Sequence, residues 1–130
     1  MAENEILSPI AQAAIVGLLC FSNTHGLELA GIVQPEHFDR VHKDLATAIL
    51  NYRRKYKGKA PGAKQLPMLL EYLPIQEEQY KAIKLLAASL PKVLKGVNRD
   101  YIVSQASTFV RAGGIIKHLM VANDFAARKP

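Results

Sequence analysis

A long apolar run close to the start of the chain constrains the fold more than any other feature. The run reads AQAAIVGLLCFSN, residues 11–23, and only Gln12 interrupts its apolar character before residue 22. Ser8 followed by Pro9 is a typical helix start, because the serine hydroxyl accepts a hydrogen bond from a free amide and proline at the first position loses none. A helix that is apolar on nearly every side has to be buried on most of them. We therefore expect the central helix of a helical bundle, ending near Phe21.

The residues in front of this run argue against export and against a membrane anchor. A secretory signal begins with positive charge, whereas MAENEILSP contains Glu3 and Glu5 and neither lysine nor arginine. The uninterrupted apolar stretch is also far shorter than the roughly 20 residues that cross a bilayer. A single cysteine, Cys20, excludes an internal disulfide. We therefore expect a cytoplasmic protein with no membrane partner.

Helical periodicity continues along the chain, and no alternating strand pattern of useful length is present. Thr24 is expected to cap a short second helix, QPEHF to form a single turn at a corner, and Asp39 to cap a longer helix that stops at the loop KGKAPG. A short helix is expected over residues 66–73. The apolar stripe of the longer helix comprises Val41, Leu45, Ala48, Ile49, Tyr52 and Tyr56.

The last third of the sequence has the pattern of two helices that pack along their length. Gly96 is expected to end the first arm and Asn98 to cap the second, while Pro91 and the Gly113-Gly114 pair are expected to kink them. Heptad-like spacing predicts two seams. The seams comprise Ile83, Leu86, Leu90, Val93 and Val97 in the first arm, and Ile102, Ala106, Phe109, Gly113, Ile116 and Met120 in the second.

These patterns predict an all-α fold, a compact helical bundle followed by a long antiparallel helical hairpin. We expect a globular subdomain over residues 1–74 and the hairpin over residues 75–127, both within one structural domain, with residues 128–130 starting a linker or tail. The second arm carries additional apolar residues beside its seam, which suggests pairing with another copy of the chain. The candidate self-association residues are Ile102, Val103, Phe109, Val110, Gly113, Ile116 and Met120.

No catalytic, cofactor-binding or metal-binding motif stands out. KGKAPGAKQ superficially resembles a nucleotide-binding loop, but counted from Gly58 the second glycine is an alanine and the hydroxyl residue is a glutamine. His37 and His42 lie near two carboxylates, yet their spacing of five misses the spacing of four that places two imidazoles on one helix face. Cys20 is expected to be a buried, inert thiol. We therefore expect no enzyme, metal site or cofactor in this chain.

Positive charge is concentrated in the later part of the chain. Residues 1–50 carry six acidic and two basic residues and residues 51–130 carry five acidic and fifteen basic ones, which gives net charges of −4 and +10. The most basic segment, NYRRKYKGK, contributes Arg53, Arg54, Lys55, Lys57 and Lys59. These cations either stabilise a solvated helix end or bind nucleic acid or an acidic protein. Tyr52 and Tyr56 fit the buried stripe, so they are poor candidates for stacking on bases.

Residues 11–73 resemble the N-terminal domain of DnaB-type replicative DNA helicases. In that family an early A-x-x-G helix leads to a P-x-x-F corner, a helix with H-x-x-[IL]-[FA]-x-A-I, a glycine-containing loop and a short helix. The hairpin that follows agrees in architecture rather than in motif. The matching residues are Ala14, Gly17, Leu18, Leu19, Pro35, Phe38, His42, Ala48, Ile49 and Gly58.

The resemblance implies a non-catalytic collar domain that assembles the helicase, as a dimer or as a hexamer built as a trimer of dimers. It also implies docking of primase or a helicase loader during DNA replication, with DNA contacted only through the whole helicase. ATP and magnesium would bind the motor domain, which this chain lacks, so the chain would be a fragment or a shortened relative of phage type. The alternative from charge alone is a small basic helical nucleic-acid-binding protein.

Overall fold

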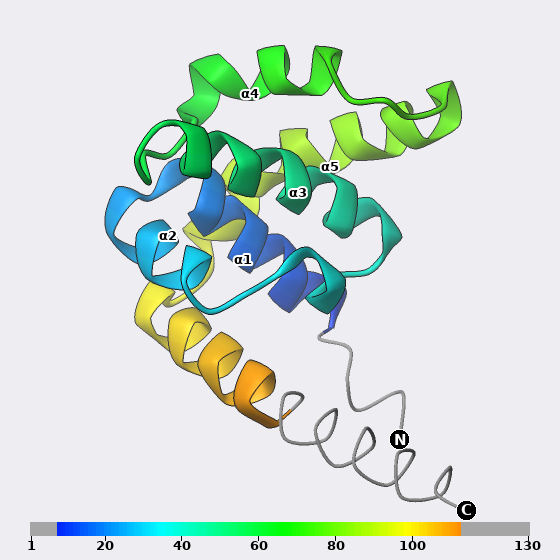
Figure 1. The fold of residues 1–130 in the computed structure, drawn as a ribbon. Helices are drawn as coiled ribbons and strands as arrows, with labels where there is room; N and C mark the ends of the chain where they lie inside the picture. The colour runs from blue at the N-terminus through cyan, green and yellow to red at the C-terminus, as the bar shows by residue number, and fades with distance from the viewer. Residues whose placement is uncertain (1–7, 113–130) are drawn as a thin grey trace, which may run out of the picture.

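The computed structural model describes residues 8–112, and this part of the chain contains helices and no strand. The expected all-α class is therefore confirmed. A further helix, called helix 99–112 below, reaches the end of the described part and is drawn in yellow to orange in Figure 1. The other elements are α1 (Pro9–Phe21), α2 (Asn23–Ala30), the single 3₁₀ turn η2 (Pro35–His37), α3 (Arg40–Lys55), α4 (Gly62–Glu71) and α5 (Glu77–Lys95).

Helix α1 occupies the centre of the bundle, with the other helices around it (Figure 1). Every residue from Ala11 to Cys20 is buried, which confirms the expectation drawn from its apolar character. The start of the helix is also as expected, because the Ser8 side chain accepts from the amide of Ala11 at 3.2 Å. The polar exception, Gln12, is fully buried. Its Oε1 accepts from the amide of Asp39 at 2.8 Å, so this side chain joins α1 to the start of α3.

Three of the four predicted helix caps, those at Ser8, Asp39 and Asn98, are correct. The Asp39 carboxylate accepts from the amide of His42 at 3.3 Å, and the Asn98 side chain accepts from the amide of Tyr101 at 3.0 Å. The predicted cap at Thr24 is wrong, because the Ser22 hydroxyl caps α2 and accepts from the amide of His25 at 3.1 Å. Ser22 also ends α1, so one residue closes the first helix and opens the second.

Helix α5 packs across α1 at Gly17. A Cβ atom added there would lie 3.1 Å from Cδ2 of Leu94, which is tighter than most Cβ contacts, so alanine at this position would require Leu94 to shift by a few tenths of an ångström. The buried face of α5 comprises Ile83, Ala87, Leu90 and Leu94. Of the predicted seam residues, Ile83 and Leu90 are buried, whereas Leu86, Val93 and Val97 are only half-buried. Helix α5 continues past the exposed Pro91 to Lys95.

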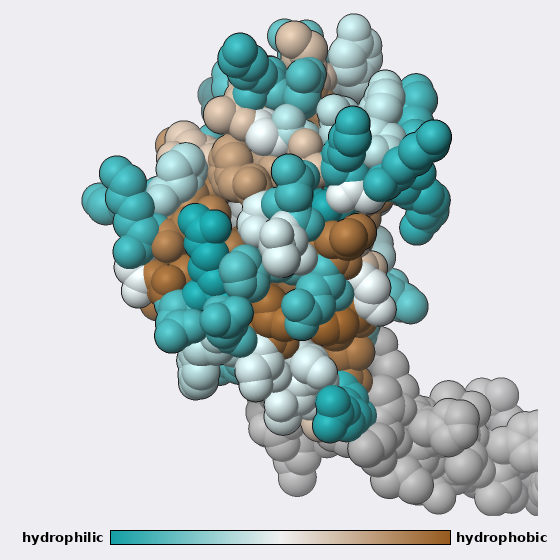
Figure 2. Space-filling model, turned by 90° about the vertical axis from the view of Figure 1, so that its left-hand side faces the viewer, coloured by the Kyte–Doolittle hydropathy of each residue, from teal (hydrophilic) through white to brown (hydrophobic). Residues whose placement is uncertain are grey.

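The surface of the bundle is mixed. Figure 2 shows hydrophobic side chains across the middle of one face, interrupted by hydrophilic ones that spread over its upper and outer parts. Within residues 8–112, no single helix combines the length and the apolar character needed to span a membrane. Helices α1 and α2 meet that criterion only together, as a pair bent by 116°.

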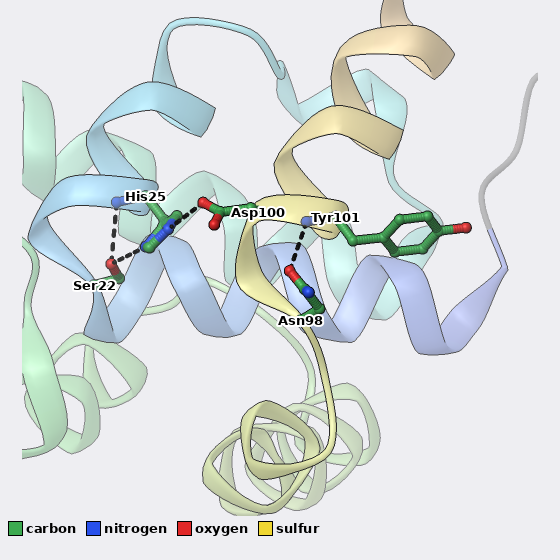
Figure 3. Close-up of polar contacts among 5 residues, drawn as sticks. All are labelled: Ser22, His25, Asn98, Asp100 and Tyr101. Atoms are coloured by element: carbon green, nitrogen blue, oxygen red, sulfur yellow. Dashed lines mark hydrogen bonds and ion pairs between the residues drawn. The ribbon is translucent and has the colours of Figure 1, made fainter.

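Helix 99–112 contacts α2 through Asp100, which meets His25, and η2 through Phe109, which meets His37. Its residues Ile102, Val103 and Ala106 are buried in the same core as α1. In Figure 3 the helix before Asn98, α5, is seen nearly end-on, whereas helix 99–112 rises from Asn98 towards the top of the picture, so the two helices do not run antiparallel. The expected hairpin is thus not seen in the described residues, and the Gly113-Gly114 pair lies outside them. The core is continuous across residue 74, so residues 8–112 form one structural unit.

Candidate docking surface

Helix α3 presents a buried face to α1 and a different, exposed face to solvent. The buried residues are His42, Leu45, Ala46, Ile49 and Arg53. The predicted stripe is therefore wrong at its C-terminal end, because Tyr52 is half-buried and Tyr56 is 45% exposed. Both tyrosine rings belong to the outer surface of α3, and the interior position that the pattern assigned to Tyr52 is taken by Arg53.

Arg53 is not part of an exposed basic patch. Its side chain is 2% exposed and donates hydrogen bonds to three backbone carbonyls. Nε donates to Leu19 at 2.7 Å, Nη2 donates to Ser22 at 2.6 Å, and Nη1 donates to Gly58. The first two acceptors lie at the end of α1 and the third in the loop after α3. Arg53 therefore ties three segments together, and the prediction that it contacts a ligand is corrected.

The guanidinium of Arg53 passes directly beside α2. A Cβ atom at Gly26 would overlap both the Arg53 Nη2 and the carbonyl oxygen of Leu18, so a side chain at this position is incompatible with the arrangement. Burial lowers the pKa of Arg53, and the neighbouring Cys20 acts in the opposite direction. The guanidinium keeps its charge because an arginine titrates far above neutral pH.

Cys20 is buried, as expected. Burial raises the pKa of its thiol to about 12, although a backbone hydrogen bond from Gly62 and the charge of Arg53 both act to lower it. The thiolate is the reactive form of cysteine. At neutral pH Cys20 is therefore a neutral, apolar part of the core.

The other four cations of NYRRKYKGK lie at the end of α3 and in the loop that follows it, and hydrogen bonds hold this loop in place. The loop is held at Gly58 by Arg53 and at Ala60, whose amide donates to the Asn23 side chain at 3.0 Å. Lys57 has a φ of 57°, a left-handed conformation that is uncommon outside glycine. We call the four exposed cations the basic segment; they are Arg54, Lys55, Lys57 and Lys59.

Beside the basic segment, α3 and α4 form the two walls of a groove of about 630 Å³. Figure 1 shows α4 running back over α3 after the loop. Three of the groove residues are large exposed hydrophobic side chains: Tyr56 at 45%, Met68 at 56% and Tyr72 at 84%. The lining residues of this α3–α4 groove are Thr47, Ala48, Asn51, Tyr52, Lys55, Tyr56, Gln65, Met68, Leu69, Tyr72, Leu73 and Pro74.

The α3 wall of the groove combines aromatic rings with one cation. The ring centroids of Tyr52 and Tyr56 are 4.5 Å apart, and Lys55 Nζ lies 5.7 Å from the centroid of Tyr56. On the α4 wall, Met68 and Tyr72 are one helical turn apart on the face opposite the buried Leu66 and Leu70. This pair was not predicted from the sequence. The spacing of four and the opposing buried leucines were the available signal.

Ser22, His25 and Asp100 lie close together where α2 meets helix 99–112 (Figure 3). His25 Nδ1 is 3.4 Å from the Ser22 Oγ, and Nε2 is 3.0 Å from an Asp100 carboxylate oxygen. His25 and Asp100 are 75 residues apart, so sequence order gave no sign of the contact. In Figure 3, Tyr101 points away from this cluster.

This cluster does not have the geometry of a hydrolytic triad. A nucleophilic serine has to face substrate and lie within about 3.2 Å of its base. Ser22 is instead 7% exposed, and its oxygen already accepts the capping hydrogen bond of α2. The Asp100 side chain is 93% exposed, so water competes for its oxygens. The cluster is best described as a polar contact that joins α2 to helix 99–112.

The histidines of the EHFDRVH segment have structural partners. His42 Nδ1 is 2.6 Å from the Asp39 carboxylate, and His37 Nδ1 accepts from the amide of Gln34 at 2.9 Å. Among residues 8–112, no group of three or more histidine, cysteine, aspartate or glutamate side chains could hold a metal ion.

The candidate self-association residues divide into three groups. Ile102 and Val103 are each 6% exposed in the core of their own chain, so the prediction that they contact another copy is wrong. Phe109 is half-buried, with its ring centroid 6.1 Å from that of His37, and Val110 is half-buried beside the core. The remaining three, Gly113, Ile116 and Met120, lie outside the described residues.

Comparison of the chain with protein-family models, with curated proteins and with solved structures found no match.

Proposed function

We propose that this chain is a non-catalytic docking and assembly domain, related to the N-terminal collar of DnaB-type replicative helicases. The α3–α4 groove is the observation that carries the docking role. It exposes Tyr56, Met68 and Tyr72 in one place. Exposed aromatic and methionine side chains gathered in a groove are typical of protein interfaces, which are enriched in these residues.

The residues that carry the family resemblance have packing or capping roles. Gly17 admits Leu94 of α5, and Phe38 is 6% exposed in the core. His42 contacts the Asp39 cap of its own helix, and Gly58 accepts a hydrogen bond from Arg53. A resemblance in such residues supports a shared helical framework. We therefore look for the function on the surface of that framework, where the groove lies.

In this proposal the partner at the surface is primase or a helicase loader, and ATP hydrolysis belongs to a separate motor domain. Self-association uses the remaining candidate residues, of which Phe109 and Val110 are half-buried on helix 99–112 and Gly113, Ile116 and Met120 follow the described part of the chain. DNA is contacted only through the assembled helicase. The chain itself contributes binding surfaces and no catalytic group.

Titration of the purified chain with the primase and the helicase loader of its source organism tests this function. Fluorescence anisotropy should show saturable binding to one of them. Tyr72→Ala should weaken it, whereas Leu85→Ala on α5 should not, since Leu85 is 74% exposed outside the groove. Light scattering at low and high salt should show oligomers that survive high salt. Binding to neither protein, together with a monomer at every salt concentration, would contradict the proposal.

A nucleic-acid-binding function is the second candidate, and the exposed basic segment is the observation that favours it. Cations that displace counterions give an affinity that falls steeply as salt rises. Labelled single-stranded and double-stranded oligonucleotides should then bind at low salt, and Lys57→Glu with Lys59→Glu should remove most of the binding. Absence of binding at low salt would eliminate this candidate.

A further inference from the structure

We propose that the α3–α4 groove receives an acidic amphipathic helix of a partner protein. The inference specifies the chemistry of the partner in the docking function proposed above, and it rests on that function for the existence of a partner. It is carried by the shape of the groove, by the sign of its charge and by the nature of its exposed side chains.

The shape of the groove suits a short helix. Its walls are two neighbouring helices, and its α3 wall extends from Thr47 to Tyr56. With a rise of about 1.5 Å per residue, that wall is about 14 Å long. This length accommodates between two and three turns of a docked helix. A helix laid into a groove uses apolar anchors spaced by three and four residues.

Charge determines which kind of helix fits. Lys55 is the single charged residue among the groove residues, which include no carboxylate. Lys57 and Lys59 follow in the loop and are exposed, and contacts at Gly58 and Ala60 hold that loop in place. Opposite charge on a partner steers its approach and fixes its direction in the groove. Glutamate or aspartate is therefore expected at the end of the helix that lies beside Lys55.

The exposed side chains supply the anchoring contacts. Among the large hydrophobic residues that the structure describes, Tyr72 is the most exposed at 84%, and Met68 precedes it by one turn at 56%. Tyrosine is enriched among the residues that dominate binding energy, and methionine adapts to irregular partner surfaces. A nucleic acid would instead need phosphate contacts along its length, and a groove lined by one lysine does not provide them.

Two labelled synthetic peptides of about three helical turns test the inference. One has leucines at positions i, i+3, i+4 and i+7 with glutamates on the flanking positions, and its matched control has lysines in place of the glutamates. Binding is measured by anisotropy. Groove variants Tyr72→Ala and Lys55→Glu are compared with Tyr101→Ala and Lys81→Glu, which change an exposed tyrosine and an exposed lysine outside the groove. Circular dichroism checks that every variant remains helical.

The inference predicts that the acidic peptide binds more tightly than the basic one. Tyr72→Ala and Lys55→Glu should each weaken that binding by roughly tenfold or more, as residues that dominate an interface do, while both control variants bind normally. Equal binding of the two peptides, no binding of either, or insensitivity to the groove variants would overturn it. Tyr72-dependent self-association or Tyr72-dependent oligonucleotide binding would also overturn it, by assigning the groove to a second copy or to nucleic acid.

The outcome for the peptides is separable from the outcome for the proposed function. If the acidic peptide binds at the groove but primase and loader do not bind, the inference stands and the helicase-related function fails. If primase or loader binds and neither peptide does, the docking function stands and the inference about the acidic helix fails.

Discussion

At the scale of single residues, Arg53 has a role that the other cations of its segment do not share. Its guanidinium donates to carbonyls at the end of α1 and in the loop after α3. A positive charge at the C-terminal end of a helix also interacts favourably with the helix dipole. The same side chain thus stabilises α1 and fixes the loop that presents Lys57 and Lys59. Arg54, the next residue, is exposed.

We predict that Arg53→Met lowers the free energy of unfolding by about 3 kcal/mol or more, because it removes a buried cation and leaves three carbonyls without their donor. Arg54→Met is the matched control and should change stability by less than about 0.5 kcal/mol. Urea denaturation of the two variants measures both effects. Equal losses would show that Arg53 is not a structural arginine.

Burial of Cys20 predicts how the free energy of unfolding changes with pH. The unfolded thiol ionises at its ordinary pKa of 9.0, whereas burial raises the folded pKa to about 12. Above pH 9.0 the unfolded state therefore loses a proton that the folded state keeps, so stability is fully present below that pH and falls as pH rises towards about 12. The expected slope is up to about 1.4 kcal/mol per pH unit.

Cys20→Ala isolates this effect from the lysines and tyrosines that titrate in the same range. The difference in unfolding free energy between wild type and Cys20→Ala should be constant up to pH 9.0 and should shift in favour of the variant above it. Denaturant melts at a series of pH values measure this difference. A difference that does not depend on pH would contradict the account of Cys20.

At the scale of secondary-structure elements, sequence predicts what is local and fails where packing decides. Ser8, Asp39 and Asn98 cap helices as expected, because a capping hydrogen bond spans only three residues. The buried row of α5 includes Leu94 instead of the predicted Val93. Two apolar rows on α5 could have been buried. The row that contains Leu94 is the buried one, and Leu94 packs against Gly17 of α1, which is far away in the sequence.

The same distinction explains the errors in the candidate site. The periodicity of α3 gave Tyr52 an inner position, yet Arg53 is buried because its acceptors at Leu19 and Ser22 are on another helix. Those acceptors are backbone carbonyls, which every residue has, so the sequence does not show which of them will bind Arg53. Helix 99–112 was expected to pack along α5 as the second arm of a hairpin. Contacts such as that of His25 with Asp100 place it beside α2 instead.

At the contact between α2 and helix 99–112, we expect replacement of Ser22 to lower stability more than replacement of Asp100. Ser22→Ala removes the cap of α2 and should lower the free energy of unfolding by about 1 kcal/mol. Asp100→Ala should change it by less than about 0.5 kcal/mol, since an exposed ion pair contributes little. Thermal or urea denaturation compares the two variants. A larger loss of stability for Asp100→Ala than for Ser22→Ala would mean that the contact of His25 with Asp100 contributes more than the helix cap, which would contradict this prediction.

At the scale of the whole molecule, the described residues form one bundle around α1 with an apolar groove on its outer side. Arg53, Cys20 and Gln12 are used inside the bundle, where they hold segments together or fill the core. The exposed hydrophobic side chains of α3 and α4 are not needed for that purpose. The proposed docking role would account for their exposure and for the basic segment next to them.

Hydrogen–deuterium exchange of the full chain, alone and with saturating primase or helicase loader, tests the docking role most directly. The account predicts slower exchange in residues 47–56 and 65–74, which contain the groove positions, with little change in helix 99–112. Protection elsewhere with an unchanged groove, or no protection by either protein, would contradict it.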